Sequence, residues 1–317
     1  MTIGIAAAGH CAGTAILETL ARIEAVAHGA VGGFISVAAM TAEEEIFRAE
    51  GQRGGARALL RSGVPRQLLA APLAVLMSSG PDRPAPLSQF TPARAGVGLV
   101  TGHRFPNTRG VDGPPLSHTA LQALENGQAP QDAVDKVLQH NPRADAGLIA
   151  LSRSGEIGIG NAALVRRHGD LGQIVERGSG YSLAVLHNSI HPHAVLGQLA
   201  RDLLVPRLAA PRARAPRSIE IVAGLPVTET ASRSVVEVQD GKATAIRLAT
   251  AFHGDACWSA GLGPDAEILS GGRLIGHARC DPFLLIEDGK LASIDGKSAF
   301  ALLYDGASRQ PAPCGAA

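Results

Sequence analysis

Apolar runs of strand length alternate with amphipathic segments along the first two thirds of the chain. Residues 2–8 are almost wholly apolar, whereas residues 14–28 place their apolar side chains at helical spacing. Residues 31–39 repeat the strand pattern, and residues 95–101 form a third strand with small side chains on both faces. This alternation predicts an α/β or α+β domain built on buried sheets.

Local signals add further elements between and after these strands. Thr41, followed by glutamates, has the form of a capped helix start. A long polar loop, residues 102–115, follows the third strand, and such loops commonly carry functional side chains. Helical patterns cover residues 56–61, 65–77, 117–126, 130–138 and 192–204, and strand patterns cover residues 146–151, 156–160 and 181–187.

The clearest break in composition is the segment 206–217, which holds three prolines and four arginines. Proline lacks an amide hydrogen and interrupts both helices and sheets, so we expect a linker here. Residues 218–305 contain short alternating runs separated by glycine-rich turns, a pattern typical of hairpins. The sequence therefore predicts a core domain over residues 1–205, the linker, a β-rich region over residues 218–305 and a tail over residues 306–317.

Composition and charge exclude several classes of function. With 45 % apolar residues among 317, the chain can bury a large core. Its 29 basic and 28 acidic residues give a net charge of +1, and only 3 % of residues are aromatic. Neither a basic field nor stacking aromatics is available for nucleic acid, so we expect no nucleic-acid partner.

Targeting signals and cysteine spacing indicate a cytoplasmic protein. The N-terminus lacks the basic start of a secretion signal, and no apolar run is long enough to span a membrane, so we expect no membrane partner. The four cysteines lie far apart with no CxxC spacing, which predicts reduced thiols rather than disulfides or a zinc knuckle. The abundance of small apolar residues also suggests a homo-oligomer.

Thr2 raises a specific chemical possibility at the start of the chain. Removal of Met1 is favoured before a small residue, and it would leave a hydroxyl and a free α-amine on Thr2. An α-amine titrates near pH ~7.7–8.0, so it can accept the hydroxyl proton near neutrality. Thr2 could then be a nucleophile that carries its own base. The alternative is that Thr2 is simply the first β-branched residue of a strand.

Two stretches of sequence support the nucleophile. "TIGIAAAG", residues 2–9, resembles the start of the catalytic segment in N-terminal nucleophile (Ntn) hydrolases, such as the "TVGAVA" of isoaspartyl peptidase/L-asparaginases. "GVGLVTGHRFPNTRGVDG…ALQALENGQAPQDAVDKVL", residues 96–138, is similar to an uncharacterised bacterial family of the same superfamily, whose members also begin Met-Thr. The resemblance implies a four-layer αββα sandwich over residues 1–205. It also implies an amidohydrolase that cleaves an amide-type bond of a small substrate through a covalent acyl-enzyme, with no cofactor.

On this reading the remaining polar residues divide into catalytic and substrate-binding candidates. Donors for the oxyanion are the amides of Gly33 or Gly102 and the side chains of Asn107 or Asn188. The α-amine could be held by Asp112, Asn161 or Ser36. The arginines near the site indicate an acidic or carboxylated ligand, because a guanidinium binds a carboxylate in bidentate fashion. The expected substrate-binding residues are Gly33, Thr101, Gly102, His103, Arg104, Arg109, His187 and His191.

Two alternatives remain open from the sequence. "HNSIHPH", residues 187–193, could supply His187, His191 and His193 to a zinc ion in a metal-dependent hydrolase, with Asp170, Asp202, His253 or His277 completing or orienting the site. Strand and helix periodicities, however, do not bring all three histidines to one point. The chain could also be a non-catalytic small-molecule binding or assembly protein on an Ntn scaffold.

Cys11 beside His10 could form a nucleophilic pair. Neighbours on a strand face opposite sides, so a buried thiol is the expected state of Cys11.

Overall fold

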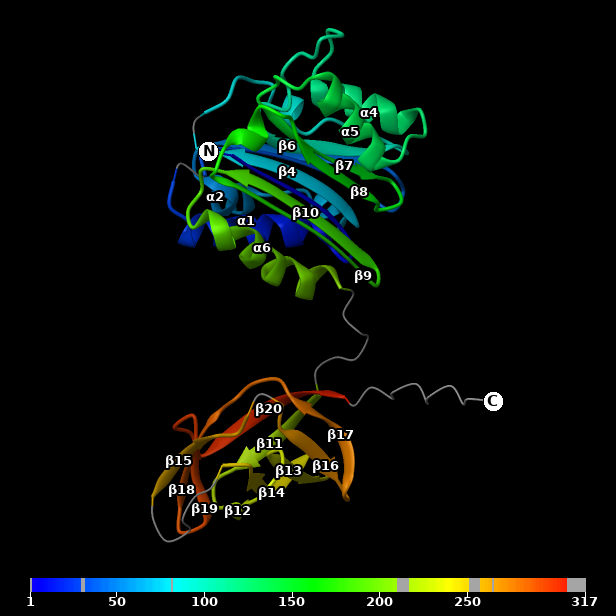
Figure 1. Cartoon of the computed structure of the whole chain (residues 1–317). Coiled ribbons are helices and arrows are strands. Elements are labelled where there is room, and N and C mark those ends of the chain that lie inside the picture. The colour runs from blue at the N-terminus through cyan, green and yellow to red at the C-terminus, as the bar shows by residue number, and fades with distance from the viewer. Residues whose placement is uncertain are drawn as a thin grey trace, which may run out of the picture. The chain divides into compact units, whose positions relative to one another are not determined.

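The computed structural model divides the chain into two compact units, Met1–Arg212 and Ala213–Ala317 (Figure 1). The structure describes residues 2–29, 32–80, 82–209, 217–250, 257–263 and 265–306. Expectations for Met1, His253, Cys314, the linker residues 210–216 and the tail from residue 307 therefore fall outside the described residues.

Two antiparallel sheets form the centre of the first unit. The larger sheet has the strand order β3-β2-β4-β1-β10-β9 and the smaller one the order β5-β6-β7-β8. The strands of the larger sheet are β1 (Thr2–Ala8), β2 (Phe34–Met40), β3 (Ile46–Gln52), β4 (Leu73–Ser79), β9 (Leu171–Gly178) and β10 (Tyr181–Asn188). Those of the smaller sheet are β5 (Ala93–Arg94), β6 (Gly98–Arg104), β7 (Ala146–Ser152) and β8 (Ile157–Asn161).

Helices cover the outer face of each sheet (Figure 1). The larger sheet packs against α1 (Ala12–Val26), α2 (Gly55–Ser62), α3 (Arg66–Ala70) and α6 (His193–Leu208). The smaller sheet packs against α4 (Leu116–Glu125) and α5 (Pro130–His140). Short 3₁₀ helices lie at Leu87–Phe90 and Val165–Arg167. This mixture of helices with antiparallel sheets confirms the α+β class.

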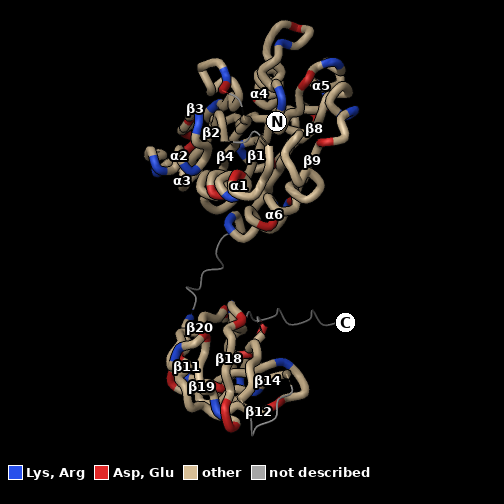
Figure 2. Tube along the Cα trace, turned by 90° about the vertical axis from the view of Figure 1, so that its left-hand side faces the viewer, with Lys and Arg blue, Asp and Glu red and all other residues tan. Residues whose placement is uncertain are grey.

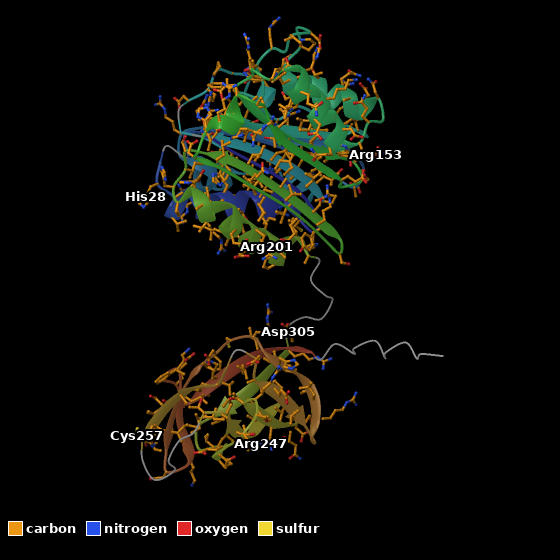
Figure 3. All side chains as sticks on the ribbon, viewed as in Figure 1. His28, Arg153, Arg201, Arg247, Cys257 and Asp305 are labelled. Carbon is orange, nitrogen blue, oxygen red and sulfur yellow. The ribbon has the colours of Figure 1, made fainter. Side chains whose placement is uncertain are left out.

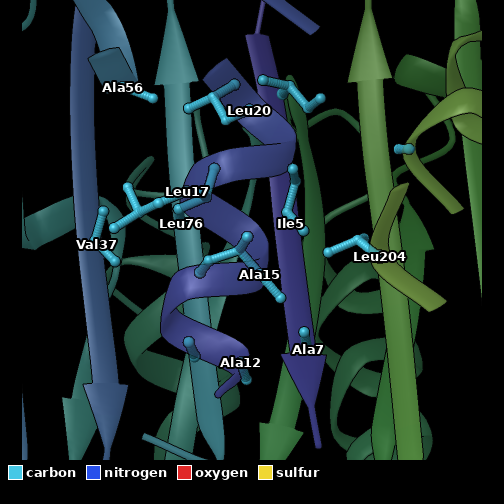
Figure 4. Close-up of a cluster of buried hydrophobic side chains, with 14 of the residues drawn as sticks. Ile5, Ala7, Ala12, Ala15, Leu17, Leu20, Val37, Ala56, Leu76 and Leu204 are labelled. Carbon is cyan, nitrogen blue, oxygen red and sulfur yellow. The ribbon is translucent and has the colours of Figure 1, made fainter. Parts of the chain in front are cut away.

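Large aliphatic side chains fill the layer between α1 and the larger sheet. Leu17 and Leu20 of α1 lie over Ile5, Val37 and Leu76 of three neighbouring strands (Figure 4). All five side chains are at most 1 % exposed. Burial of such side chains stabilises the fold by about 1.5–3 kcal/mol each, so this layer supplies much of the stability of the first unit.

Small residues let the two sheets approach each other closely. The core between them includes Ala6, Ala38 and Ala184. At the β1–β6 crossing, a Cβ added to Gly4 would lie 2.3 Å from the carbonyl oxygen of Gly102, so only glycine fits. Small residues are therefore concentrated where the two sheets face each other. The close approach of the sheets places the end of β6 beside the start of β1, where Arg104 bonds Thr2.

Two expected helices are strands in part or whole. The amide of Glu45 does bond Thr41 Oγ1 at 3.3 Å, as in a helix cap. The chain nevertheless turns through Glu44, whose φ is 65°, and enters β3, which pairs with β2 along its length. Within residues 65–77, α3 ends at Ala70 and β4 begins at Leu73. β4 is buried on both faces, and a continuous apolar run does not distinguish such a strand from a buried helix.

Two element boundaries also differ from expectation. The strand expected at 31–39 begins at Phe34 among the described residues. Helix α6 continues through Pro206 to Leu208, beyond the start of the expected linker. Its side chains at Leu204 and Leu208 are buried against the larger sheet, so tertiary packing maintains the helix across the proline.

The second unit is made of strands among its described residues. The strands follow the order β11-β20-β17-β16-β13-β14-β12, and a parallel contact between β11 and β14 at Glu220 and Lys242 closes six of them into a barrel. Strands β15, β18 and β19 form a separate sheet. Their bounds are β11 (Arg217–Val222), β12 (Val227–Glu229), β13 (Val235–Gln239), β14 (Lys242–Leu248), β15 (Trp258–Gly261), β16 (Glu267–Ser270), β17 (Arg273–Ala278), β18 (Phe283–Glu287), β19 (Lys290–Ile294) and β20 (Ala299–Gly306).

Charged residues of both signs are interspersed on helices, turns and strand ends in each unit (Figure 2). This distribution agrees with the near-zero net charge of the chain. Among the described helices, none is both long and apolar enough to cross a membrane.

Candidate active site

Thr2 begins β1 at one end of the facing sheets of the first unit. In the larger sheet it stands opposite Asn188 on β10 and Ser79 on β4. Thr2 is 1 % exposed, and its Oγ1 donates a 2.7 Å hydrogen bond to Asn188 Oδ1. The same oxygen accepts a 2.5 Å hydrogen bond from the amide of Arg104. The hydroxyl is thus held by an acceptor from one sheet and a donor from the other.

The amide of Arg104 is directed by an unusual backbone conformation. Arg104 ends β6 with a φ of 63°, in the left-handed region that non-glycine residues seldom adopt. Its guanidinium forms a bidentate pair with Asp145, with Nη2 3.2 Å from Oδ2 and Nε bonded to Oδ1. This pair anchors the side chain and offsets the backbone cost. The guanidinium is therefore already paired and is not free for a substrate carboxylate.

His103 adds a neutral imidazole beside Asn188. It is fully buried, and its Nε2 lies 2.6 Å from Asn161 Oδ1. Because an amide oxygen only accepts, Nε2 carries the ring proton. Burial lowers the pKa of His103 to about 4, against the opposing effects of Asn161 and Asn188. A Cβ at Gly147 would lie 2.4 Å from the ring, so glycine at this position makes room for it.

Asn188 is held on its other side by a serine and an aspartate. Its Nδ2 donates to Ser189 Oγ at 3.1 Å. Ser189 Oγ in turn donates to Asp170 Oδ2, and the Ser189 amide donates to the Asp170 carbonyl at 3.2 Å. The hydrogen bond from Ser189 lowers the pKa of Asp170, so this carboxyl is ionised at neutral pH. A continuous chain of hydrogen bonds therefore connects Thr2 to an anion.

A cavity of about 460 Å³ lies two strands from Thr2. Leu171 in its wall is opposite Asn188 in the sheet register, and Asn188 is opposite Thr2, which places this wall roughly 10 Å from Thr2. The cavity offers polar and charged groups beside aliphatic ones. It is lined by Asp135, Ile159, Gly160, Asn161, Arg166, Leu171 and Gln173.

Three further residues expected at the site have structural partners. The amide of Gly33 donates to the carbonyl of Ser79 at 2.9 Å, so it is already used. Thr101 Oγ1 donates to the Leu76 carbonyl at 2.9 Å and ties the two sheets together. Gly102 lies in the antiparallel ladder between β6 and β7. Among the described residues, none of the three is hydrogen-bonded to the hydroxyl of Thr2, which bonds Asn188 and Arg104.

Three residues of the polar loop have other partners or are exposed. Asn107 Nδ2 donates to Gln89 at 2.8 Å. The Asp112 carboxylate lies 3.3 Å from His140 Nε2 and both side chains are exposed. Arg109 is exposed as well. None of the three has a described contact with Thr2 or Asn188, because the loop leaves the sheet directly after Arg104.

The "HNSIHPH" histidines do not converge. His187 is opposite Ile3 in the register, so it faces the helices rather than the space between the sheets. His191 is exposed and pairs with His28 through the backbone, and its ring lies 5.4 Å from that of His193. Within the described residues, no group of three or more histidines, cysteines or acidic residues is arranged to hold a metal ion.

His187 is notable for its burial. It is fully buried, and neither ring nitrogen has a hydrogen-bond partner among the described residues. Burial lowers its pKa to about 4, with further lowering by His103 and His193. His187 is therefore a neutral side chain packed under α6, on the opposite face of β10 from Asn188.

Cys11 and His10 lie closer than the strand argument predicted. His10 Nε2 is 3.5 Å from Cys11 Sγ. β1 already ends at Ala8, and Cys11 has a φ of 46°, so strand alternation does not apply to this pair. The prediction that the two side chains diverge is wrong for this reason.

The sequence did not identify several residues of the site. Ser189 and Asp145 gave no signal of their own, because a serine after a strand and an aspartate before one are common in turns. Asp170 was considered only as a metal ligand. The polar run around Asn188 was a usable signal for Ser189, whereas the cavity residues Arg166 and Gln173 depend on contacts between distant strands.

The first unit is thus an α+β domain with a buried threonine at the end of a central strand. Residues 2–217 match the family described as "Domain of unknown function (DUF6963)", and the chain belongs to this family. Residues 224–299 match a second family of the same kind, "Domain of unknown function (DUF7259)".

Comparison with other proteins adds little. No curated protein sequence matches the chain. Among solved structures, the chain is similar to glutamine phosphoribosylpyrophosphate (PRPP) amidotransferase from B. subtilis complexed with ADP and GMP, at 11 % identity and a TM-score of 0.32. That match covers 58 % of this chain and 41 % of the other. A likeness at this level supports no conclusion about fold or activity.

Proposed function

We propose that the first unit is an N-terminal threonine hydrolase that cleaves an amide-type bond in a small substrate. Thr2 is the nucleophile after removal of Met1. The observation that carries the proposal is the placement of Thr2 Oγ1 between Asn188 Oδ1 at 2.7 Å and the Arg104 amide at 2.5 Å.

The arrangement of layers favours the same proposal. Two antiparallel sheets with helices on their outer faces support the proposal that the first unit adopts the four-layer αββα sandwich that the sequence resemblance implies. Thr2 opens a central strand of this arrangement, at the end where the sheets meet. A nucleophile at the first residue of a buried strand has its backbone fixed on both sides, which preserves its geometry.

In the proposed reaction, Thr2 Oγ attacks the substrate carbonyl while the α-amine of Thr2 accepts the hydroxyl proton. The C–N bond breaks, the amine returns this proton to the leaving nitrogen, and an ester on Oγ remains. Water then hydrolyses the ester and regenerates the hydroxyl. The Arg104 amide donates to Thr2 Oγ1 and fixes the position of the attacking oxygen, whereas negative charge develops on the carbonyl oxygen of the substrate. No cofactor is required.

The cavity next to Asn161 is the proposed position of the rest of the substrate. Since Arg104 is paired with Asp145, the cationic group available for a substrate carboxylate is Arg166, which lines the cavity. Arg166→Gln is expected to raise KM for a carboxylated substrate more than it lowers kcat. A larger loss of kcat than of binding would contradict this assignment.

The test of the proposal begins with the N-terminus. Intact mass of the purified protein establishes whether Met1 is removed, and the processed protein is then screened on small amides, lactams and acyl-amino acids. Thr2→Ala is expected to abolish turnover with unchanged circular dichroism, and Thr2→Ser to retain part of it. Thr14→Ala on α1, which removes a hydroxyl bonded to the Leu69 carbonyl of α3, is the matched control. Retention of Met1 in a fully active protein would exclude the mechanism.

A further inference from the structure

The polar side chains next to Thr2 form a directed chain. Thr2 Oγ1 donates to Asn188 Oδ1, Asn188 Nδ2 donates to Ser189 Oγ, and Ser189 Oγ donates to Asp170 Oδ2. Thr2, at the start of β1, lies 186 residues from Asn188, whereas Asp170, ahead of β9, lies 19 residues from Ser189. They meet because β9, β10 and β1 are neighbours in the larger sheet.

The Asp170 carboxylate determines which group donates and which accepts in each of these hydrogen bonds. A carboxylate only accepts hydrogen bonds, so Ser189 must give its single hydroxyl proton to Asp170. The Ser189 oxygen can then only accept from its other neighbour, which turns the NH₂ group of the Asn188 amide toward it. The amide oxygen of Asn188 consequently faces Thr2, and the hydroxyl proton of Thr2 points at that oxygen.

This direction also determines which lone pair of Thr2 is available. A hydroxyl oxygen has two lone pairs, and one accepts the amide hydrogen of Arg104. With the proton directed to Asn188 in the resting site, the second lone pair is left to face the substrate carbonyl. For attack the hydroxyl turns about its Cβ–Oγ bond and gives its proton to the α-amine, because the amide oxygen of Asn188 is not a base. If the Asn188 amide turned over, its NH₂ group would donate to Thr2 and occupy the lone pair needed for attack.

Ser189 occupies a backbone position that serine seldom adopts. Its φ is 52°, a left-handed conformation that glycine adopts with little strain. The hydroxyl of Ser189 accepts a hydrogen bond from Asn188 and donates one to Asp170. Its backbone also bonds Asp170, so the serine is fixed at both main chain and side chain.

We propose that Asp170 and Ser189 are positioning residues that fix the orientation of the Asn188 amide, and through it the hydroxyl of Thr2. The catalytic consequence rests on the proposed function, whereas the orientation of Asn188 does not. Neither residue touches the substrate in this proposal.

The orientation of Asn188 can be measured directly, because the chain contains only five asparagines. Full-length, Met1-processed protein labelled with ¹⁵N-asparagine gives five side-chain amide pairs, and Asn188→Ala identifies the pair of Asn188. Ser189→Gly removes the hydroxyl but suits the left-handed backbone, so it is expected to fold. Asp170→Ala removes the acceptor, and Asp170→Asn restores a neutral one. Asp132→Asn, an exposed aspartate in the first turn of α5, is the matched control.

We expect Ser189→Gly and Asp170→Ala to shift the Asn188 amide resonances and to speed their hydrogen exchange roughly tenfold, the loss of one buried hydrogen bond. Asp170→Asn should recover much of this protection, and Asp132→Asn should change nothing. Unchanged Asn188 resonances in both Ser189→Gly and Asp170→Ala, in proteins with wild-type thermal melting, would overturn the proposal.

The catalytic part is measured with p-nitrophenyl acetate as the probe. Transfer of an acetyl group to Thr2 is followed by release of nitrophenol and by the mass of the N-terminal peptide. We expect the wild-type protein to be acylated at Thr2. A rate at least tenfold lower in Ser189→Gly and Asp170→Ala, and a recovered rate in Asp170→Asn, would support the positioning role. Acylation at the wild-type rate in both variants overturns that role. Absence of acylation at Thr2 in wild type counts against the proposed function and the positioning role, while the resonances still decide the orientation of Asn188.

Discussion

The two units differ most in the polar groups that they bury. In the described part of the chain, the first unit buries fourteen polar or charged residues, whereas the second buries Ser234 alone. Both have continuous apolar cores. Burial of a polar group costs free energy unless it is hydrogen-bonded. The first unit gathers several of these groups, including His103, Asn161 and Asn188, at the strand ends around Thr2, and this concentration is what distinguishes a candidate site from a stable scaffold.

Truncation of the apolar cores should give the largest effects and should separate the two units. Leu20→Ala in α1 and Ile246→Ala in β14 each remove a fully buried side chain. Each should cost about 2–5 kcal/mol of the free energy of unfolding of its own unit. Trp258, the single tryptophan, reports on the second unit by fluorescence, and helical circular dichroism reports on the first. Equal shifts of both signals in both variants would show that the units unfold together.

Adding a methyl group between the two sheets should cause the next largest loss of stability. Gly4→Ala would place a Cβ 2.3 Å from the backbone of Gly102, which cannot move independently of its strand. We expect a loss of about 1–3 kcal/mol in urea denaturation and a weakened contact between Thr2 and Arg104. Gly169→Ala, with no atom within 4 Å of the added Cβ, is the control. Gly4→Ala at wild-type stability would contradict the close approach of the sheets.

The pH dependence of stability should show opposing contributions within the first unit. Burial raises the pKa of Glu24 from 4.5 to about 7, despite its hydrogen bond from the Ala56 amide. The folded state therefore binds the proton more tightly, and the free energy of unfolding falls as pH rises from about 4.5 to 7. His103 and His187, with pKa values lowered from 6.5 to about 4, act oppositely, so their contribution is lost as pH falls from 6.5 toward 4.

Glu24→Gln should isolate the histidine contribution. Without the carboxyl, the free energy of unfolding should rise more steeply with pH between about 4.5 and 6.5 than in wild type. Thermal melting across this range measures the slope. Identical slopes for the variant and wild type would mean that Glu24 titrates normally in the folded protein.

Ion pairs on the surface should have the smallest effect in both units. Arg201 on α6 pairs with Glu176 and Asp202, and Arg247 in the second unit pairs with Glu237 (Figure 3). All these side chains are partly exposed to water, which screens the interaction. Arg201→Gln and Arg247→Gln should each lower the thermal melting temperature much less than the core truncations do. A loss as large as that of a core truncation would identify either pair as a structural anchor.

The local pattern of apolar and polar residues was sufficient to predict an element that has its own periodicity and its own start and stop residues. Pro130 and the apolar positions after it predicted α5, which covers Pro130–His140. The same pattern predicted a helix where the structure has β4. The apolar residues of β4 are buried between β2 and β1 and have no amphipathic period, so the pattern does not identify the strand. The strand pattern also gave a wrong prediction for His10 and Cys11. β1 ends at Ala8, and Cys11 has a left-handed backbone, so the two side chains do not alternate as they would in a strand.

The sequence by itself predicted a domain of mixed helices and strands, α/β or α+β, and singled out Thr2 and Asn188 as separate candidates. Only the tertiary structure brought them together: Asn188 lies 186 residues and Arg104 lies 102 residues from Thr2 along the chain, yet both bond its hydroxyl. Contacts across such separations depend on strand register and on the distance between sheets. Gly4 and Gly102 determine that distance through their packing, and no local pattern encodes it.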